Sequence, residues 1–260
     1  MSEETQKAPR TDVSDDRIVG AAPAGTSDEA SAATAVREMF SSIAPRYDLL
    51  NHVLSMNVDR MWWNRTAKTF AGTLSRPNVR VLDLCCGTGD MTFALQKRMR
   101  GAAGKLIGAD FSHAMLVLAN EKTRSREVCW VEADALKLPF ASDRFDLLTA
   151  AFGFRNLANY DYGLTEIYRV LKTEGEVGIL DFGEPEGLIG SVYRLYFRHV
   201  LPTIGTLISG VRGPYAYLPR SVQRFPSPEE MLDRMRAAGF RGVSWNPYTF
   251  GIAGLYRGKK

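Results

Sequence analysis

Strand-like and helix-like patterns alternate through the middle of this chain. Apolar, strand-like stretches cover residues 79–86, 105–112, 128–136, 145–153 and 175–183, with two more near 243–248 and 252–257. Between the first five lie helix-length stretches such as GTGDMTFALQKRM and HAMLVLANEKT. Strands joined by helices form right-handed βαβ units, which place the strands in a parallel sheet with helices on both faces. We therefore predict an α/β fold around a mostly parallel seven-stranded sheet.

The N-terminal part of the chain follows a different pattern. The first 30 residues hold seven acids and three bases, a net charge of −4 in a chain whose total is +4. Residues 1–31 also lack apolar periodicity, so we predict a disordered acidic tail there. Apolar residues at helical spacing between about residues 32 and 70 predict an N-terminal helical cap. The expected organisation is a tail over 1–31 and one domain over 32–260.

Composition excludes several classes of protein. Three cysteines and three histidines form no CxxC or HExxH motif, so we expect no metal site. An acidic, polar start argues against a secretory signal, and no apolar run approaches the roughly 18 residues of a membrane span. We expect a cytoplasmic protein. The isoelectric point of about 9.0 raises the alternative of an RNA-binding protein.

The segment LDLCCGTGD, residues 82–90, is typical of a nucleotide-binding turn. It places Gly87 and Gly89 between a first strand and a helix N-terminus, where the backbone can approach a ligand. A dinucleotide fingerprint would have a third glycine at Thr92, and Asp83 would repel a pyrophosphate. A ligand with a cationic centre, such as S-adenosylmethionine, suits this turn better than NAD. A tight turn without a ligand is the alternative.

Two further acids support an adenosyl pocket. Asp110 ends the second strand, 21 residues after Gly89, where a carboxylate can accept hydrogen bonds from ribose hydroxyls. Asp134 ends the third strand, where its carboxylate and the N–H of Ala135 can bind an adenine edge. With Asp83, three acids at the ends of three successive strands predict one pocket.

The fourth strand has an unusual end, AAFGFRN. Gly153 lies between two phenylalanines and is followed at once by Arg155 and Asn156. We interpret Gly153 as a tight turn, with the arginine and asparagine facing a polar or charged group. The alternative is a strand-end arginine paired with a helix carboxylate such as Asp161 or Glu166.

Several motifs resemble the UbiE/MenG/COQ5 family of S-adenosylmethionine-dependent C-methyltransferases. They are RVLDLCCGTGDMTFAL, GADFSHAML, ADALKLPFASDRFDLLTAAFGFRN and YRVLK, and the likeness extends over residues 36–260. The resemblance implies a class I (Rossmann-like) methyltransferase fold. It also implies methylation of a polyprenylated quinol, most directly demethylmenaquinol to menaquinol in menaquinone biosynthesis, with the benzoquinol step of ubiquinone biosynthesis kept open.

The resemblance assigns residues to the cofactor as well. It implies that Thr88, Asp110, Asp134 and Ala135 contact S-adenosylmethionine. The chain departs from the family at Ala151, where a serine is common, and at LDFGEP, which replaces LEFSxP and borders the substrate.

Roles at the reacting centre follow from the chemistry of a quinol. Arg155 stays protonated, so it can stabilise a developing oxyanion but cannot act as a base. Asn156 can orient a water or the second ring oxygen. Tyr47 and Asp48 are candidates for closing the pocket, while His52 and His199 are weaker candidates for a base.

Residues 187–228 form an arginine- and aromatic-rich insertion without acids, which we interpret as an amphipathic lid. Apolar residues recur at helical spacing over 189–200, which favours peripheral membrane contact; a helix packed on the sheet is the alternative. That apolar face suits lipid better than RNA, so we expect no nucleic-acid partner. Other acceptors (a soluble phenol or a sterol), a non-catalytic cofactor-binding scaffold and a homodimer remain open alternatives.

Overall fold

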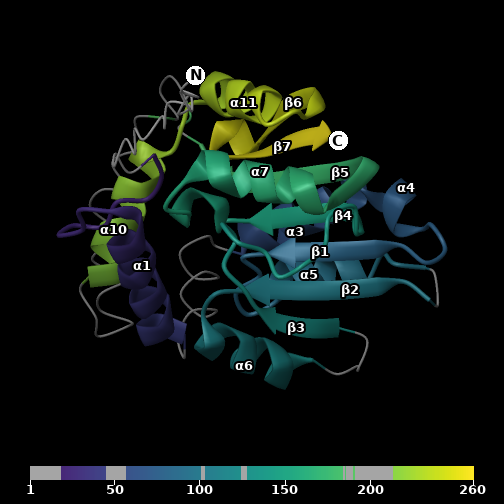
Figure 1. The fold of residues 1–260 in the computed structure, drawn as a ribbon, viewed down its shortest axis with the longest axis horizontal. Coiled ribbons are helices and arrows are strands. Elements are labelled where there is room, and N and C mark those ends of the chain that lie inside the picture. Colours follow the sequence, from purple (N-terminus) through teal and green to yellow (C-terminus); the bar gives the residue numbers. More distant parts are fainter. Residues whose placement is uncertain are drawn as a thin grey trace, which may run out of the picture.

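The structure is a computed structural model that describes residues 19–44, 57–100, 103–123, 128–183, 185, 190 and 213–260. Its centre is one seven-stranded sheet with the order β3-β2-β1-β4-β5-β7-β6 (Figure 1). The strands are β1 (Arg80–Leu84), β2 (Lys105–Asp110), β3 (Val128–Glu132), β4 (Phe145–Ala151), β5 (Leu171–Phe182), β6 (Arg241–Tyr248) and β7 (Ala253–Lys259). The first five are parallel, and β7 runs antiparallel to its two neighbours. The predicted fold class is confirmed.

The central strands bury mostly apolar side chains because helices cover both faces of the sheet. On one face, α3 (Val58–Thr69), α4 (Ala71–Leu74) and α5 (Asp90–Gln96) bury a cluster that includes Trp62, Phe70 and Leu95. On the other, α7 (Tyr160–Val170) and α11 (Pro228–Ala237) bury Ile167 and Met231. Helix α6 (His113–Lys122) packs on β2 and β3. No helix in the described part of the chain is long and apolar enough to cross a membrane.

Two helices lie beyond the carboxyl ends of the parallel strands. Helix α1 (Glu29–Ile43) and helix α10 (Gly213–Arg224) contact each other and stand side by side where β1, β2 and β4 end (Figure 1). In doubly wound sheets this edge is where ligands bind. Of the predicted N-terminal helical cap, the structure shows helices α1 and α3. Residues 45–56, between them, lie outside the described residues.

The predicted boundary of the disordered tail is wrong for residues 19–31. Ala21 is buried, and helix α1 begins at Glu29 behind an Asp28 capping box. Within that box the Ser31 N–H donates to the Asp28 carboxylate at 2.8 Å. A capping box satisfies backbone groups locally, so an acidic, alanine-rich stretch can begin a helix without an apolar stripe. Residues 1–18 lie outside the described residues.

Candidate functional site

The chain leaves β4 through a sharp reversal. Phe152 adopts a left-handed conformation (φ 56°), and Phe154–Asn156 then form one 3-10 turn, η2. Gly153 has an ordinary φ of −114°, so it does not supply the turn predicted for it. Its role is close approach, because a Cβ at Gly153 would lie 2.3 Å from the Cβ of Cys85. Glycine there lets the end of β4 pack against the loop after β1.

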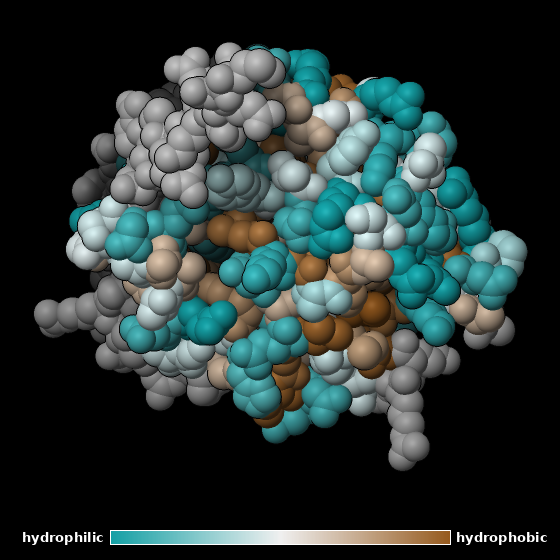
Figure 2. All heavy atoms as spheres, viewed as in Figure 1, coloured by the Kyte–Doolittle hydropathy of each residue, from teal (hydrophilic) through white to brown (hydrophobic). Residues whose placement is uncertain are grey.

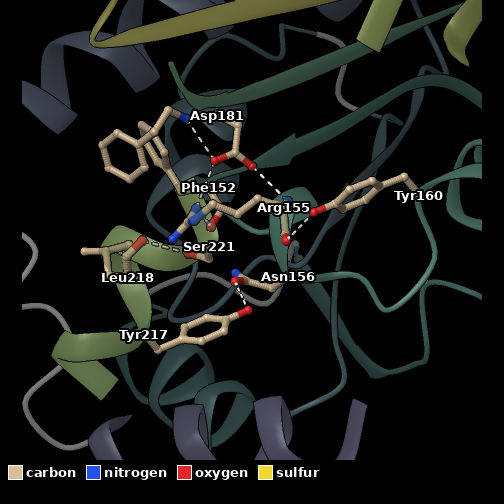
Figure 3. Close-up of polar contacts among 9 residues, drawn as sticks. Phe152, Arg155, Asn156, Tyr160, Asp181, Tyr217, Leu218 and Ser221 are labelled. Carbon is tan, nitrogen blue, oxygen red and sulfur yellow. Dashed lines mark hydrogen bonds and ion pairs between the residues drawn. The ribbon is translucent and has the colours of Figure 1, made fainter. Parts of the chain in front are cut away.

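Arg155 is buried and held by a carboxylate from the next strand. Asp181 of β5, itself fully buried, accepts from Arg155 Nη1 at 2.9 Å and from the Arg155 backbone N–H at 3.0 Å (Figure 3). Arg155 Nη1 also donates to the Phe152 carbonyl. Asp161 and Glu166, the carboxylates considered from sequence, pair instead with Arg234 and Arg169.

The Nε–H of Arg155 is a donor that neither Asp181 nor the Phe152 carbonyl accepts from. This nitrogen is buried and has no hydrogen-bond partner among the described residues. An unsatisfied buried donor costs free energy comparable to a lost hydrogen bond. The Arg155 guanidinium is thus fixed in place by Asp181 and the Phe152 carbonyl, which bond its Nη1 but not its Nε.

Asn156 and two tyrosines complete this part of the site. Tyr217 of α10 donates to Asn156 Oδ1 at 3.1 Å, and Tyr160 donates to the Arg155 carbonyl at 3.1 Å (Figure 3). Burial raises the pKa of Tyr217 to about 12 and that of Tyr160 still higher, so both phenols stay neutral. These tyrosines act as donors that hold the turn and cannot serve as bases near neutral pH.

A first pocket lies at the carboxyl ends of β1, β2 and β4. Four of the predicted cofactor residues line it: Gly87, Asp110, Asp134 and Ala135. Its other walls are mainly apolar and include Phe111, Met115, Leu136, Ala151 and Phe152, while Ala33 and Phe40 of α1 cover it. Asn156 lines the same pocket.

Asp110 is the buried carboxylate of this pocket. It accepts from the backbone N–H of Gly87 and of Ser112, both at 2.9 Å. Burial raises the pKa of Asp110 to about 6, and the two backbone donors partly oppose that shift. Each carboxylate oxygen can still accept a further hydrogen bond. Asp134 lies exposed at the pocket edge, where it accepts from the Leu136 N–H at 2.9 Å.

Three predicted cofactor residues do not line this pocket. Asp83 is fully buried behind it and accepts from the hydroxyls of Thr92 at 2.5 Å and Thr149 at 2.7 Å. Burial raises the pKa of Asp83 to about 7. Thr88 is also buried, and Gly89 (φ 91°) caps α5 against Trp130. These residues shape the loop that carries Gly87 rather than the pocket surface.

A second, larger pocket of about 920 Å³ is lined by α1, α10 and residues 21–24. Its polar wall includes Arg155, Tyr160 and Tyr217, with Arg220 and Arg224 of α10. The opposite wall is formed by residues 21–24 and by Ala35 and Met39 of α1. Figure 2 shows the surface hollowed beside α1, with hydrophobic residues in the hollow.

Sequence reasoning missed several of these residues. Asp181 could have been found as an acid inside the otherwise apolar strand ILDF. Nothing in the sequence pairs Tyr217 with Asn156, because 61 residues separate them. Tyr47, Asp48, His52, His199 and the amphipathic segment 189–200 were predicted to take part. They lie outside the described residues, except Gly190.

Comparisons with known proteins find similar sequences and similar folds. The ubiE/COQ5 methyltransferase family matches residues 27–260. The chain is 49% identical over 229 residues to demethylmenaquinone methyltransferase of Deinococcus radiodurans, covering 87% of this chain and 92% of that protein. Identity to the enzyme of the same name from Thermus thermophilus is 48%, covering 85% and 100%. A ubiquinone/menaquinone biosynthesis C-methyltransferase of Geobacter sulfurreducens is 40% identical, covering 86% and 88%.

Solved structures share the fold at low identity. A possible histamine N-methyltransferase from Thermotoga maritima superposes with a TM-score of 0.61 at 20% identity, covering 86% of this chain and 99% of that one. A SAM-dependent methyltransferase from Aquifex aeolicus gives 0.54 at 20% identity, covering 74% and 88%. With the family match spanning nearly the whole described structure, the chain belongs to the ubiE/COQ5 methyltransferase family and is an S-adenosylmethionine-dependent methyltransferase.

Proposed function

We propose that this enzyme transfers the methyl group of S-adenosylmethionine to a ring carbon of a prenylated quinol, most directly demethylmenaquinol. The observation that carries this proposal is the position of Arg155 and Asn156 between two pockets. Asn156 lines the smaller, acid-edged pocket, and Arg155 lines the larger one. The names of the most similar relatives support a demethylmenaquinone-type acceptor.

The smaller pocket fits S-adenosylmethionine by the chemistry of its lining. Asp110 offers carboxylate oxygens to ribose hydroxyls, and Asp134 with Ala135 offers an acceptor and a donor for an adenine edge. Apolar side chains such as Met115 and Leu136 suit the faces of a purine. Asp83 stands behind the loop and contributes negative potential to a cationic ligand without touching it.

The cofactor supplies an electrophilic methyl group on a sulfonium, and the acceptor must supply an electron-rich carbon. A quinol does so best as its hydroxyl loses a proton, which places negative charge on that oxygen. Arg155 can stabilise the charge with its guanidinium, because the residue lines the larger pocket and Asp181 and the Phe152 carbonyl already fix it in place. A preorganised donor of this kind needs no rearrangement as the charge develops.

Other side chains orient the acceptor and leave the proton to water. Tyr217 fixes the amide of Asn156, whose remaining donors can orient a ring oxygen or a water. The guanidinium of Arg155 and the neutral tyrosines cannot take the proton near neutral pH. Because the larger pocket is not enclosed, the proton can leave to water.

Direct assay of acceptors tests this proposal. Purified enzyme would be given S-adenosylmethionine with a prenylated naphthoquinol, a prenylated benzoquinol or a soluble phenol, and the products identified by mass spectrometry. We expect a methyl group on carbon in the naphthoquinol, with less product from the benzoquinol. Methylation of the soluble phenol alone would refute the quinol assignment and favour a different small acceptor.

We further propose peripheral contact with a membrane, because a prenylated acceptor resides in lipid. The supporting observation is the sequence of residues 189–200, where apolar residues recur at helical spacing and Arg194 and Arg198 lie off that face. Such a helix can lie at an anionic lipid surface with its arginines near the headgroups.

A further inference from the structure

Residues 20–24, here called the N-terminal strap, run along the larger pocket before helix α1 begins. They precede residue 27, where the family match starts. The strap is held on two sides. The N–H of Gly20 donates to the Ala158 carbonyl at 3.0 Å, and the N–H of Ala21 donates to the Leu157 carbonyl at 2.8 Å. Arg224 Nε of α10 donates to the Gly20 carbonyl at 2.9 Å.

These contacts join the strap directly to the reacting centre. Leu157 and Ala158 follow Arg155 and Asn156 without a gap in the chain. Arg224 lines the same pocket as Arg155. A displacement of the strap would therefore disturb the wall of the pocket and the segment that carries the arginine. Leu157 and Ala158 also line the smaller pocket, but its acids Asp110 and Asp134 lie on other loops. The larger pocket, which the strap itself lines, should therefore be disturbed more than the smaller one.

Gly20 is required for this fit. A Cβ there would lie 2.0 Å from the Leu157 carbonyl oxygen and 2.6 Å from the Ala158 carbonyl carbon. Both neighbours are backbone atoms, so a side chain could be accommodated only by moving the strap away. Gly72 in helix α4 gives the contrast, because a Cβ there meets nothing within 4 Å.

The strap supplies the apolar side of the larger pocket. Ala21, Ala22, Pro23 and Ala24 line it, facing a wall that includes Arg155, Tyr217 and Arg220. An aromatic acceptor has apolar faces and polar oxygens, so it needs one wall of each kind. Three alanines leave room that larger side chains would fill.

We propose that the N-terminal strap forms the apolar wall of the acceptor site and limits the size of the acceptor, with Gly20 as the residue that positions it. This inference rests on the proposed quinol function. It assigns a specificity role to residues outside the family match, and it predicts that the strap affects acceptor binding more than cofactor binding.

The first test compares Gly20→Ala with the matched control Gly72→Ala. We expect Gly20→Ala to raise KM for a prenylated naphthoquinol about tenfold. The dissociation constant of S-adenosylmethionine, measured by calorimetry, should change by a smaller factor, about threefold at most. Gly72→Ala should match the wild type in both. An unchanged KM in Gly20→Ala, or an equal loss of cofactor affinity, would overturn the proposal.

A second variant keeps the strap in place and narrows the pocket. Ala22→Leu leaves the contacts of Gly20 and Ala21 intact, so folding should be normal. KM should rise more for a prenylated naphthoquinol than for an unsubstituted naphthoquinol, because the larger acceptor meets the added side chain. An equal effect on the two acceptors would contradict a size-limiting wall.

A binding measurement separates this inference from the proposed function. Equilibrium dialysis of a prenylated naphthoquinone, with S-adenosylhomocysteine present, reports acceptor binding without turnover. If Gly20→Ala weakens naphthoquinone binding but the enzyme methylates no quinol, the strap proposal is supported and the quinol function is refuted. If the enzyme methylates the quinol but wild type and Gly20→Ala bind the naphthoquinone equally, the function is supported and the strap proposal is refuted. A wild type that neither binds nor methylates would overturn both.

Discussion

Three buried carboxylates surround the site, and each is held by a different kind of donor. Asp83 is held by two threonine hydroxyls, Asp110 by two backbone N–H groups and Asp181 by the Arg155 guanidinium. Burial raises the pKa of Asp83 to about 7 and that of Asp110 to about 6. Asp181 instead balances the charge of Arg155. Both carboxyl groups near the smaller pocket therefore have pKa values closer to neutral pH than an exposed acid has.

Asp110 should contribute strongly to cofactor binding. Asp110→Ala removes the acceptor that we assign to the ribose, and should weaken S-adenosylmethionine binding by about 1.5–3 kcal/mol, the range for hydrogen bonds to charged groups. Calorimetry measures the effect, with Asp233→Asn on the exposed face of α11 as a control for a changed acid. Equal affinities in wild type and Asp110→Ala would show that Asp110 does not bind the ribose.

Cofactor affinity should depend on pH. A cationic ligand favours ionised carboxylates, so it lowers the raised pKa values of Asp110 and Asp83 and releases protons on binding. Affinity should therefore rise as pH increases from about 5 to about 7, and level off above that. Calorimetric titrations in buffers of different ionisation enthalpy would give the number of protons released on cofactor binding. A flat affinity over this range, without proton release, would contradict the assignment.

At the scale of elements, the site depends on how the end of β4 meets the loop after β1. The alternation of strands and helices, and the acids at the ends of β1 and β2, could be predicted because both follow from local periodicity. The role of Gly153 could not, since it depends on the Cβ of Cys85, which is 68 positions away in the sequence. The pairing of Arg155 with Asp181 could not be predicted either, because it too depends on residues far apart in the sequence. Asp181 reaches Arg155 only because β4 and β5 pair.

Gly153→Ala tests this close approach. A Cβ at Gly153 would overlap the Cβ of Cys85, so the substitution should lower the free energy of unfolding by about 1–3 kcal/mol, as overpacking does. Gly72→Ala, in an exposed helix position, should instead leave stability unchanged or raise it by about 0.5–1 kcal/mol. Urea denaturation of both variants gives the comparison. A fully stable Gly153→Ala would mean that the two loops do not need this contact.

At the scale of the whole molecule, α1, α10 and the N-terminal strap enclose the edge of the sheet where the strands end. Helix α1 contributes to both pockets, and α10 supplies Tyr217, Arg220 and Arg224 to the larger one. The sequence indicated α1 and an arginine-rich insertion, but not that these segments meet. Residues 19–31 were predicted to be disordered because they lack apolar periodicity. The structure holds Gly20 and Ala21 by backbone hydrogen bonds, which require no apolar pattern.

Membrane contact would bring the enzyme to a prenylated acceptor in the bilayer. Replacing Arg194 and Arg198 together with glutamate should reduce flotation with anionic liposomes severalfold, since each basic residue near such a surface contributes about 1 kcal/mol. The effect should shrink at high salt. The matched pair Arg234→Glu/Arg236→Glu, in helix α11, should float like wild type. Equal flotation of the 194/198 variant and wild type would rule out this surface as the contact.

The central claim is that Arg155, fixed by Asp181, stabilises the charge that develops on the acceptor during methyl transfer. Steady-state kinetics of Arg155→Ala with a prenylated naphthoquinol, together with calorimetry of cofactor binding, test it most directly. We predict that kcat falls by about 10²–10³, as when an oxyanion-hole donor is removed, while S-adenosylmethionine affinity stays within about twofold of wild type. A near-normal kcat, or a loss explained by weaker cofactor binding, would contradict this role and leave Arg155 as a structural partner of Asp181.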